Sequence, residues 1–320
     1  YYSETIYIKN QTKIKSELMT FGVMFHHFHD HVHSKIQGSI SKNQFKKKNL
    51  FLKKKYVLNN ADVYIEKILN KKITTKDICL TFDDSLKSQA DIALPILRKE
   101  KIKAFFFIYT GVFENNPDNL EIFRYFRNTE YQNINLFYQD FFKLLETFFP
   151  NNFLTLKKNF TNKYLNQYKI YSLSDRKFRF CRDKILTKDS YDLLMFKLMK
   201  KKGFNYKLAK KKLFMTRSDL KNLIKYKQVI GLHSTTHSVN LSNLSYKDQM
   251  EEYKDNMNFI KQFVKSKPIS MSHPFGRYNK NTLKILNNIG VKIGFLSCKK
   301  NRIKSLLEIP RIDHVEFARH

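Results

Sequence analysis

Short runs of consecutive apolar residues alternate along this chain with segments of helical length. The runs at 78–82 (ICLTF) and 104–109 (AFFFIY) are almost continuous, which is typical of strands that a parallel sheet buries on both faces. A segment with helical spacing, 86–100, lies between them. Strand, helix and strand in this order predict right-handed βαβ units and a parallel sheet.

The same alternation extends over most of the 320 residues. We predict strands at 22–28, 78–82, 104–109, 228–232, 268–272, 291–297 and 307–311, with a shorter one at 56–58. This count suits an α/β fold, a distorted or incomplete (β/α) barrel of about seven strands. In such barrels the chemistry lies where the strands end.

The alternation stops at about residue 119 and resumes after about residue 222. This stretch is rich in Lys and in aromatic residues at helical spacing, so we predict a helical insertion at 119–222 that packs on the barrel. Its aromatic stripe indicates a hydrophobic core rather than a ligand site. Residues 1–18 are polar and Lys-rich, and we interpret them as an N-terminal extension or a fragment edge before one domain at 19–320.

The formal net charge of +32 is extreme and admits two interpretations. A basic protein can bind nucleic acid or an anionic surface. However, only 11 of the 60 basic residues are Arg, and the Lys residues are scattered through every segment. This pattern favours compositional bias and solubility, and it disfavours nucleic acid as a partner.

Compartment and membrane signals are sparse. Three cysteines far apart make no disulfide framework and indicate a reducing compartment. The sequence has no run of 18 apolar residues and no apolar segment of a signal peptide at its start. We therefore expect no transmembrane span and a cytoplasmic location, which includes the inner face of the membrane. The sequence gives no indication of the oligomeric state.

Polar side chains that can bind a metal follow the predicted strands. Asp83 and Asp84 end the strand at 78–82, and His233 ends the strand at 228–232 with His237 four residues later. One carboxylate and two imidazoles suit Zn, Fe, Co or Ni with positions left open for water and substrate. Spacing of four brings both rings to one side if the segment begins a helix. An Asp-Asp pair or two histidines four residues apart also occur by chance. The prediction therefore depends on finding both after predicted strands of one chain.

Four segments resemble motifs of one known family. They are 81–85 (TFDDS), 233–238 (HSTTHS), 272–278 (SHPFGRY) and 22–26 (GVMFH). In this order they are similar to the motifs of the polysaccharide deacetylases, the NodB-homology carbohydrate esterases. The resemblance covers most of the chain outside the insertion.

This resemblance implies a distorted (β/α) barrel that holds a divalent metal and removes acetyl from an N-acetylated sugar. It implies Asp83 as the general base and Asp84, His233 and His237 as ligands of Zn, with Co or Ni as alternatives. The backbone N–H near Phe275 would stabilise the oxyanion, in a loop that Pro274 and Gly276 shape.

The sequence departs from the family's pattern at two places. Ser272 stands where many members have an Arg that supports the base, and Arg277 or Arg311 is the candidate substitute. The family's late His, the general acid, has no clear match, because no apolar strand is evident before His314 or His320. We therefore expect His26, at the end of the first strand, to be the general acid. The neighbouring histidines at 27–33 form either a second metal site or, as we favour, a loop.

Three hypotheses of function follow. The first is metal-dependent hydrolytic deacetylation of an N-acetylated sugar in surface polysaccharide or lipopolysaccharide biosynthesis, with a carbohydrate as substrate. The second is hydrolysis of another amide or ester on the same scaffold, because a fold does not determine its substrate. The third is a catalytically weak or inactive homologue, or a basic protein that binds an anionic glycan, a membrane surface or nucleic acid.

Overall fold

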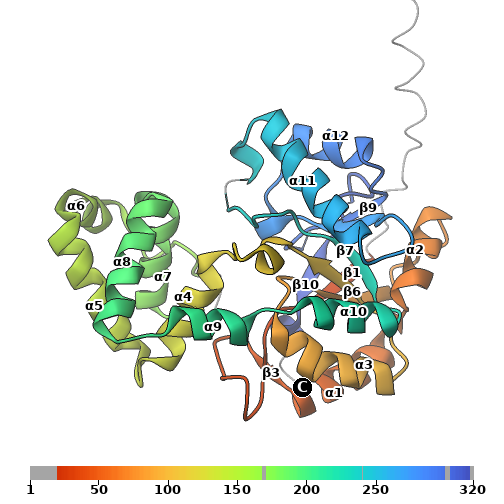
Figure 1. The fold of residues 1–320 in the computed structure, drawn as a ribbon, viewed down its shortest axis with the longest axis horizontal. Coiled ribbons are helices and arrows are strands. Elements are labelled where there is room, and N and C mark those ends of the chain that lie inside the picture. Colours follow the sequence, from red (N-terminus) through yellow and green to blue (C-terminus); the bar gives the residue numbers. More distant parts are fainter. Residues whose placement is uncertain (1–19, 168–170, 240, 300–302, 318–320) are drawn as a thin grey trace, which may run out of the picture. The chain divides into compact units, whose positions relative to one another are not determined.

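The computed structural model describes residues 20–167, 171–239, 241–299 and 303–317 (Figure 1). Two compact units are found. Unit 1 contains the described residues up to His33, Gly38–Asp118 and the described residues from Phe214 onward; unit 2 contains Ser34–Gln37 and Asn119–Leu213. The extension predicted at 1–18 and His320 lie outside the described residues. None of the helices in the described ranges has the length and apolar character that a membrane crossing requires.

A parallel sheet of seven strands forms the centre of unit 1. Its order is β10-β1-β5-β6-β7-β8-β9, and a bridge from Phe295 in β9 to Ile309, just before β10, nearly closes it. The strands are β1 (Phe21–Phe25), β5 (Asp77–Phe82), β6 (Phe105–Ile108), β7 (Val229–Leu232), β8 (Ser270–Ser272), β9 (Ile293–Phe295) and β10 (Arg311–Asp313). The predicted distorted (β/α) barrel of about seven strands is confirmed.

Three short strands lie outside this path. β4 (Val57–Leu58) pairs with β5, while β2 (Phe28–His29) and β3 (Ile40–Ser41) form a small sheet of their own. The helices of unit 1 are α1 (Lys42–Lys55), α2 (Ala61–Leu69), α3 (Leu94–Lys99), α10 (Arg217–Lys225), α11 (Tyr246–Lys261) and α12 (Lys280–Asn288). Its single helical turns are η1 (Gln89–Ala93), which is π-helical, and the 3₁₀ turns η2 (Gly111–Glu114), η4 (Leu241–Asn243), η5 (Pro274–Gly276) and η6 (His314–Phe317).

Stacked aromatic rings align the strands on which the site is built. Phe25 in β1 is opposite Phe82 in β5, which is opposite Phe106 in β6. The rings of Phe82 and Phe106 stack at 4.6 Å between centroids, and all three side chains are fully buried. A slip by one residue would turn every side chain of a strand to the other face. This packing fixes the register of the strands. His26 and Asp83, which follow Phe25 and Phe82, are therefore at the same level of the sheet.

Unit 2 is helical and has its own aromatic core. It contains α4 (Asn119–Thr129), α5 (Ile134–Phe148), α6 (Pro150–Asn159), α7 (Leu173–Phe180), η3 (Cys181–Ile185), α8 (Lys188–Lys201) and α9 (Tyr206–Leu213). Phe126, Phe137 and Phe141 of the predicted aromatic stripe are fully buried, in agreement with a core role. The helical insertion expected at 119–222 ends earlier, because α10 belongs to unit 1, where Leu220 and Leu223 are buried in the core of the barrel.

Candidate metal centre and active site

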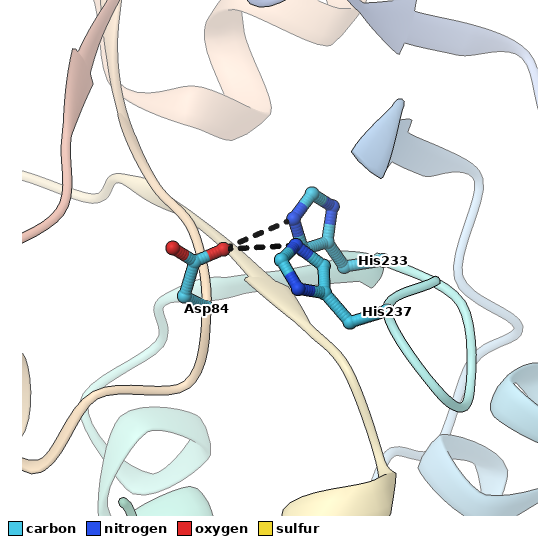
Figure 2. Close-up of side chains that lie close together, drawn as sticks. All are labelled: Asp84, His233 and His237. Carbon is cyan, nitrogen blue, oxygen red and sulfur yellow. Dashed lines mark ion pairs between the residues drawn. The ribbon is translucent and has the colours of Figure 1, made fainter. Parts of the chain in front are cut away.

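The carboxyl ends of β5 and β7 bring the three predicted metal ligands together. Asp84 lies two residues beyond the end of β5, and His233 directly follows β7. The Asp84 Oδ1 atom lies 3.3 Å from the Nε2 atom of His233 and 3.3 Å from that of His237 (Figure 2). All three residues are buried, and their ligand atoms lie within 4.8 Å of one another. Sequence reasoning therefore identified three residues that the fold gathers at one point.

The chemistry of these atoms fits a cation. His233 Nδ1 donates a hydrogen bond to the carbonyl oxygen of Ser272 at 2.8 Å, so its Nε2 presents a lone pair toward the Asp84 carboxylate. This Nε2 atom is buried and has no hydrogen-bond partner in the described part of the chain. A lone pair and a carboxylate oxygen facing each other in a buried site are satisfied by a metal ion between them.

A second carboxylate, that of Asp118, orients the His237 ring through the ring nitrogen that does not face Asp84. Its Nδ1 atom donates to Asp118 Oδ2 at 3.2 Å, an arrangement that fixes the tautomer of a metal-ligating imidazole. Burial acts to lower the pKa of His237, but Asp84 and Asp118 outweigh it and raise the pKa to about 10. The pKa of Asp84 lies well below its usual value, because the positive charges of His237 and His26 outweigh the effect of burial. Two carboxylates, those of Asp84 and Asp118, thus flank the His237 ring.

The segment that carries both histidines is a loop, not the start of a helix. Ser234 and His237 have positive φ angles of 62° and 55°, a conformation that costs free energy for residues other than Gly. The Glu252 carboxylate of α11 accepts hydrogen bonds from the backbone N–H groups of Thr235 and Thr236, both at 3.0 Å, and from the Thr236 hydroxyl at 2.7 Å. The two rings face Asp84 because α11 holds this loop, and not through helical spacing.

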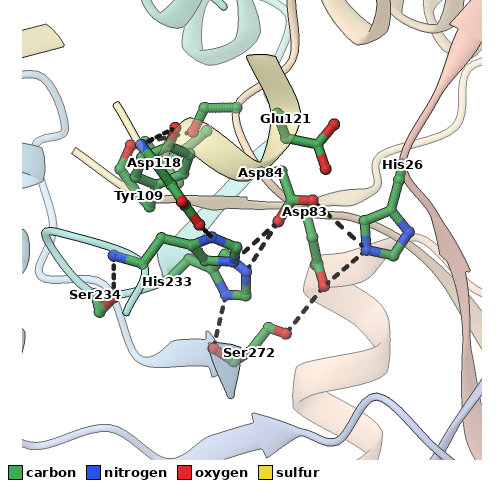
Figure 3. Close-up of polar contacts among 12 residues, drawn as sticks. His26, Asp83, Asp84, Tyr109, Asp118, Glu121, His233, Ser234 and Ser272 are labelled. Carbon is green, nitrogen blue, oxygen red and sulfur yellow. Dashed lines mark hydrogen bonds and ion pairs between the residues drawn. The ribbon is translucent and has the colours of Figure 1, made fainter. Parts of the chain in front are cut away.

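Asp83 is held by an arginine from a distant part of the chain. Arg311 donates from NH1 to Oδ1 at 2.8 Å and from NH2 to Oδ2 at 2.6 Å. Ser272 also donates to Asp83 Oδ2, at 3.2 Å, and accepts from Arg311 at 2.7 Å (Figure 3 shows the Ser272 contact). Burial acts to raise the pKa of Asp83, but the positive charge of Arg311 and its hydrogen bonds hold the pKa below its usual value. Asp83 is therefore an ionised carboxylate.

Of the two candidate arginines, the fold brings only Arg311 to Asp83. Arg277 donates instead to the carbonyl oxygen of Val239 at 2.8 Å. Arg311 reaches Asp83 because β1 lies between β10 and β5 in the sheet. Ser272 occupies the strand position at which many family members have arginine. Its hydroxyl contacts both Asp83 and Arg311.

The loop of the proline–aromatic–glycine motif lies beside the metal ligands. The Phe275 ring packs against His237 with 4.5 Å between ring centroids, while 40% of the residue stays exposed. Gly276 has a φ angle of 65°, and a Cβ there would lie 2.1 Å from Ser297 Oγ, so a larger residue would be strained and would displace the Ser297 hydroxyl. With Pro274 directly after His273, the turn η5 presents the Phe275 ring at the edge of the site.

His26 lies on the other side of the carboxylates. Its Nε2 atom is 3.8 Å from Asp83 Oδ2 and 3.9 Å from Asp84 Oδ2 (Figure 3). A quarter of its side chain is exposed, so a ligand can reach it. Among the neighbouring histidines, His29 contacts Ser39 at 2.8 Å and His33 pairs with Asp91 at 3.0 Å. In the described ranges, the three metal ligands above are the only cluster of metal-binding side chains.

The expectation that no strand precedes His314 is wrong. The strand β10 ends at Asp313, directly before His314, although the sequence shows no apolar strand there. The ring stacks on Phe25 at 5.0 Å between centroids, and its Nε2 atom donates to the Gly38 carbonyl at 3.1 Å. Burial lowers the pKa of His314 to about 4. The residue is thus a neutral, hydrogen-bonded packing group.

Asp118 and Glu252 are site residues that sequence reasoning missed. Asp118 follows β6 by ten residues, within the loop after that strand, and loops at strand ends carry site residues in such folds. That position was an available signal. Glu252 lies within a helix whose acidic residues look like ordinary surface charge, and no spacing in the sequence connects it with Thr235 or Thr236.

The comparisons with known proteins agree with this geometry. The family model described as polysaccharide deacetylase matches residues 70–126 and 186–294, more than half of the chain. No curated protein sequence matches the chain.

Three solved structures share the fold over more than 90% of both chains. The Streptococcus pyogenes deacetylase PplD in complex with acetate matches with a TM-score of 0.55 and 16% identity, covering 93% of each chain. IcaB from Ammonifex degensii matches with 0.54 and 15%, covering 93% of this chain and 91% of its own. A de-N-acetylase from Aggregatibacter actinomycetemcomitans matches with 0.54 and 13%, covering 92% and 95%. By its family match and its site, the chain belongs to the polysaccharide deacetylase family, hydrolases that act on carbon–nitrogen bonds.

Proposed function

We propose that this protein removes the acetyl group from an N-acetylated sugar unit during surface polysaccharide or lipopolysaccharide biosynthesis, acting on a precursor in the cytoplasm. One observation carries the proposal. A carboxylate held by arginine, Asp83, adjoins a buried set of one carboxylate and two imidazoles. This arrangement supports hydrolysis of an amide, because such a reaction uses a proton acceptor beside a metal-bound water.

Asp84, His233 and His237 would hold the metal. The nitrogen and oxygen donor set suits Zn, and also Co or Ni. When bound, such a metal supplies Lewis acidity to the acyl carbonyl and acidifies a water molecule. The two outer hydrogen bonds, to Ser272 and Asp118, keep both Nε2 atoms aimed at this point.

Asp83 and His26 would divide the proton transfers between them. Asp83 is ionised and accepts a proton from the attacking water. His26 lies within 4 Å of both carboxylates and donates a proton to the departing amine nitrogen. The backbone N–H near Phe275 donates a hydrogen bond to the developing oxyanion. Pro274 and Gly276 set the geometry of that loop.

A carbohydrate substrate is supported by the family and by the rim of the site. Phe275 exposes an aromatic face beside His237, and such faces provide apolar contact area next to polar ligand groups. One of the proteins that share this fold is called a de-N-acetylase, and another was solved with acetate. Both support the assignment of acetyl as the group removed.

Acetate release tests the proposal. Purified protein loaded with Zn, Co or Ni should release acetate from N-acetylated sugars and their nucleotide or lipid-linked forms. Asp83→Asn and Asp84→Ala should each reduce the rate by at least about 10³-fold, because each removes one part of the machinery. Asp255→Asn, an exposed position on α11, is the matched control and should retain the wild-type rate. Full activity in Asp83→Asn and Asp84→Ala would refute the proposal.

The same assay separates the alternative substrates. A panel that pairs acetylated sugars with simple amides and esters should show at least a tenfold preference for the sugars. If small amides or esters are hydrolysed better, the protein is a metal hydrolase of another substrate. Salt-dependent glycan binding that survives His233→Ala, without acetate release, would indicate a binding homologue.

A further inference from the structure

The Gln89 side chain connects the ends of two strands that carry the site. Gln89 begins the π-helical turn η1 and is only 1% exposed. Its Nε2 atom donates hydrogen bonds to the carbonyl oxygen of His26 at 2.9 Å and to that of Asp83 at 2.5 Å. One amide group thus bridges the residue after β1 and the residue after β5.

The environment of this amide determines its orientation. Both neighbouring atoms are carbonyl oxygens, so the nitrogen must face them and the oxygen must face away. The Oε1 atom is buried and has no hydrogen-bond partner in the described ranges of the chain. A buried acceptor without a partner is destabilising, so the favourable contribution of Gln89 comes from its two N–H bonds. A π-helical turn is also rare and is frequently found at functional sites.

The residue before Gln89 binds the same segment. Ser88 Oγ accepts a hydrogen bond from the backbone N–H of Phe28 at 3.3 Å. The start of η1 therefore holds the chain at both ends of the short segment from His26 to Phe28. The Asp83 carboxylate has separate support from Arg311 and from the Ser272 hydroxyl. The His26 ring depends more directly on the backbone that Gln89 fixes.

We infer that Gln89 is a positioning residue that sets the separation between the His26 ring and the two carboxylates, Asp83 and Asp84. The inference rests on the proposed function, in which His26 gives a proton to the leaving nitrogen. Without the bridge, the His26 backbone is free to move relative to β5, and the ring leaves its place beside Asp83. The two histidine ligands are anchored elsewhere, by Ser272, Asp118 and Glu252, and should remain in place.

Gln89→Met tests this role, because methionine has a similar length and no N–H donor. On an N-acetylated sugar, kcat of the metal-saturated enzyme should fall by roughly 10–100-fold, the usual cost of losing a hydrogen bond that orients a site residue, with KM unchanged. On an aryl acetate, whose leaving group departs without a proton, the loss should be at most about twofold. His26→Ala should show the same contrast between substrates, and the double variant should be no slower than His26→Ala.

Gln228→Met is the matched control. Gln228 is another buried glutamine whose amide binds backbone groups, those of Ala104, Ile102 and Tyr226, away from the site. Its loss should reduce stability and leave the ratio of sugar to aryl acetate rates unchanged. A purely structural role of Gln89 would produce this same pattern in Gln89→Met.

Two results would overturn the inference. One is an equal loss on both substrates in Gln89→Met; the other is additive losses in the double variant. If the wild type with metal releases no acetate from any substrate, the proposed function fails instead. Crystal structures then decide the inference separately: a His26 Nε2 that stays within 4 Å of both carboxylates in Gln89→Met would refute it.

Discussion

Arg311 and Asp83 form a two-point ion pair in the interior of the barrel, with NH1 to Oδ1 at 2.8 Å and NH2 to Oδ2 at 2.6 Å. The Arg311 side chain is fully buried, and that of Asp83 is 3% exposed. The guanidinium also donates to the Leu296 carbonyl and the Thr81 hydroxyl. The pair therefore connects β10 with the end of β5 and keeps the Asp83 carboxylate ionised.

Removing the guanidinium should be costly for both stability and activity. Arg311→Met leaves a buried carboxylate without its partner, and the free energy of unfolding should fall by about 3–5 kcal/mol. Arg311→Lys should also lose activity, because an ammonium cannot make both contacts. Urea denaturation measures the first effect, and a double variant with Asp83→Asn should recover part of the loss without recovering activity. A change below about 1 kcal/mol in Arg311→Met would show that the pair is unimportant for stability.

Asp118 should tune metal affinity through His237. In Asp118→Asn the Nδ1 atom of His237 loses its ionised acceptor, so the imidazole becomes a weaker and less well oriented ligand. The dissociation constant for Zn should rise by about 10–100-fold, as measured by competition with a chelator. Asp255→Asn, at an exposed position on α11, is the control and should bind Zn as tightly as the wild type. Equal affinities for wild type and Asp118→Asn would exclude this role.

Glu252 should act on the same affinity by holding the loop between the two histidines. Glu252→Ala removes the acceptor for two backbone N–H groups and one hydroxyl, so the positive φ angles of Ser234 and His237 lose their support. We expect weaker Zn binding in Glu252→Ala. Glu252→Gln, which keeps an oxygen acceptor, should show a smaller effect. Glu251→Ala, at an exposed neighbouring position, is the control. If both Glu252 variants bind Zn as tightly as this control, the contacts of Glu252 are not required to hold the loop in its metal-binding conformation.

Stability should depend on pH through Asp77, the first residue of β5. Burial acts to raise its pKa, but hydrogen bonds from Lys67, Thr74 and Asn59 lower it to about 2. A carboxyl with a depressed pKa stabilises the fold above its unfolded pKa, near 4, and loses that contribution as the pH falls toward 2.

Denaturation at a series of pH values checks this. Asp77→Asn should cost about 1–3 kcal/mol at pH 7 and should flatten the decline below pH 4. A wild type and an Asp77→Asn variant that lose stability in parallel over this range would contradict the assignment.

The barrel was predictable because its strands are buried on both faces. Continuous apolar runs at 78–82 and 104–109 correspond to β5 and β6. The polar residues that follow the predicted strands at 78–82 and 228–232 placed Asp84 and His233 at one edge of the sheet. The last strand was less predictable. The apolar residues Leu307 and Ile309 precede β10 and are buried, so hydrophobicity alone put this strand a few residues too early.

The contacts that hold the site residues in place could not be predicted from the sequence. Choosing Arg311 over Arg277 required the strand order that puts β1 between β10 and β5. The roles of Glu252 and Gln89 depend on contacts of helices and helical turns with loops and strand ends, for which no sequence spacing gives a signal. For Asp118, the only signal was its position in the loop after β6. The HSTTH segment matched helical spacing by coincidence, since its geometry comes from a loop with two residues at positive φ.

Bound metal per chain is the most direct measurement of the central claim. Protein prepared with Zn and then desalted should contain about one equivalent of Zn per chain, and both His233→Ala and Asp84→Ala should contain almost none. Asp255→Asn should match the wild type. A wild type that retains no Zn, Co or Ni, or a His233→Ala variant that retains as much metal as the wild type, would contradict the account.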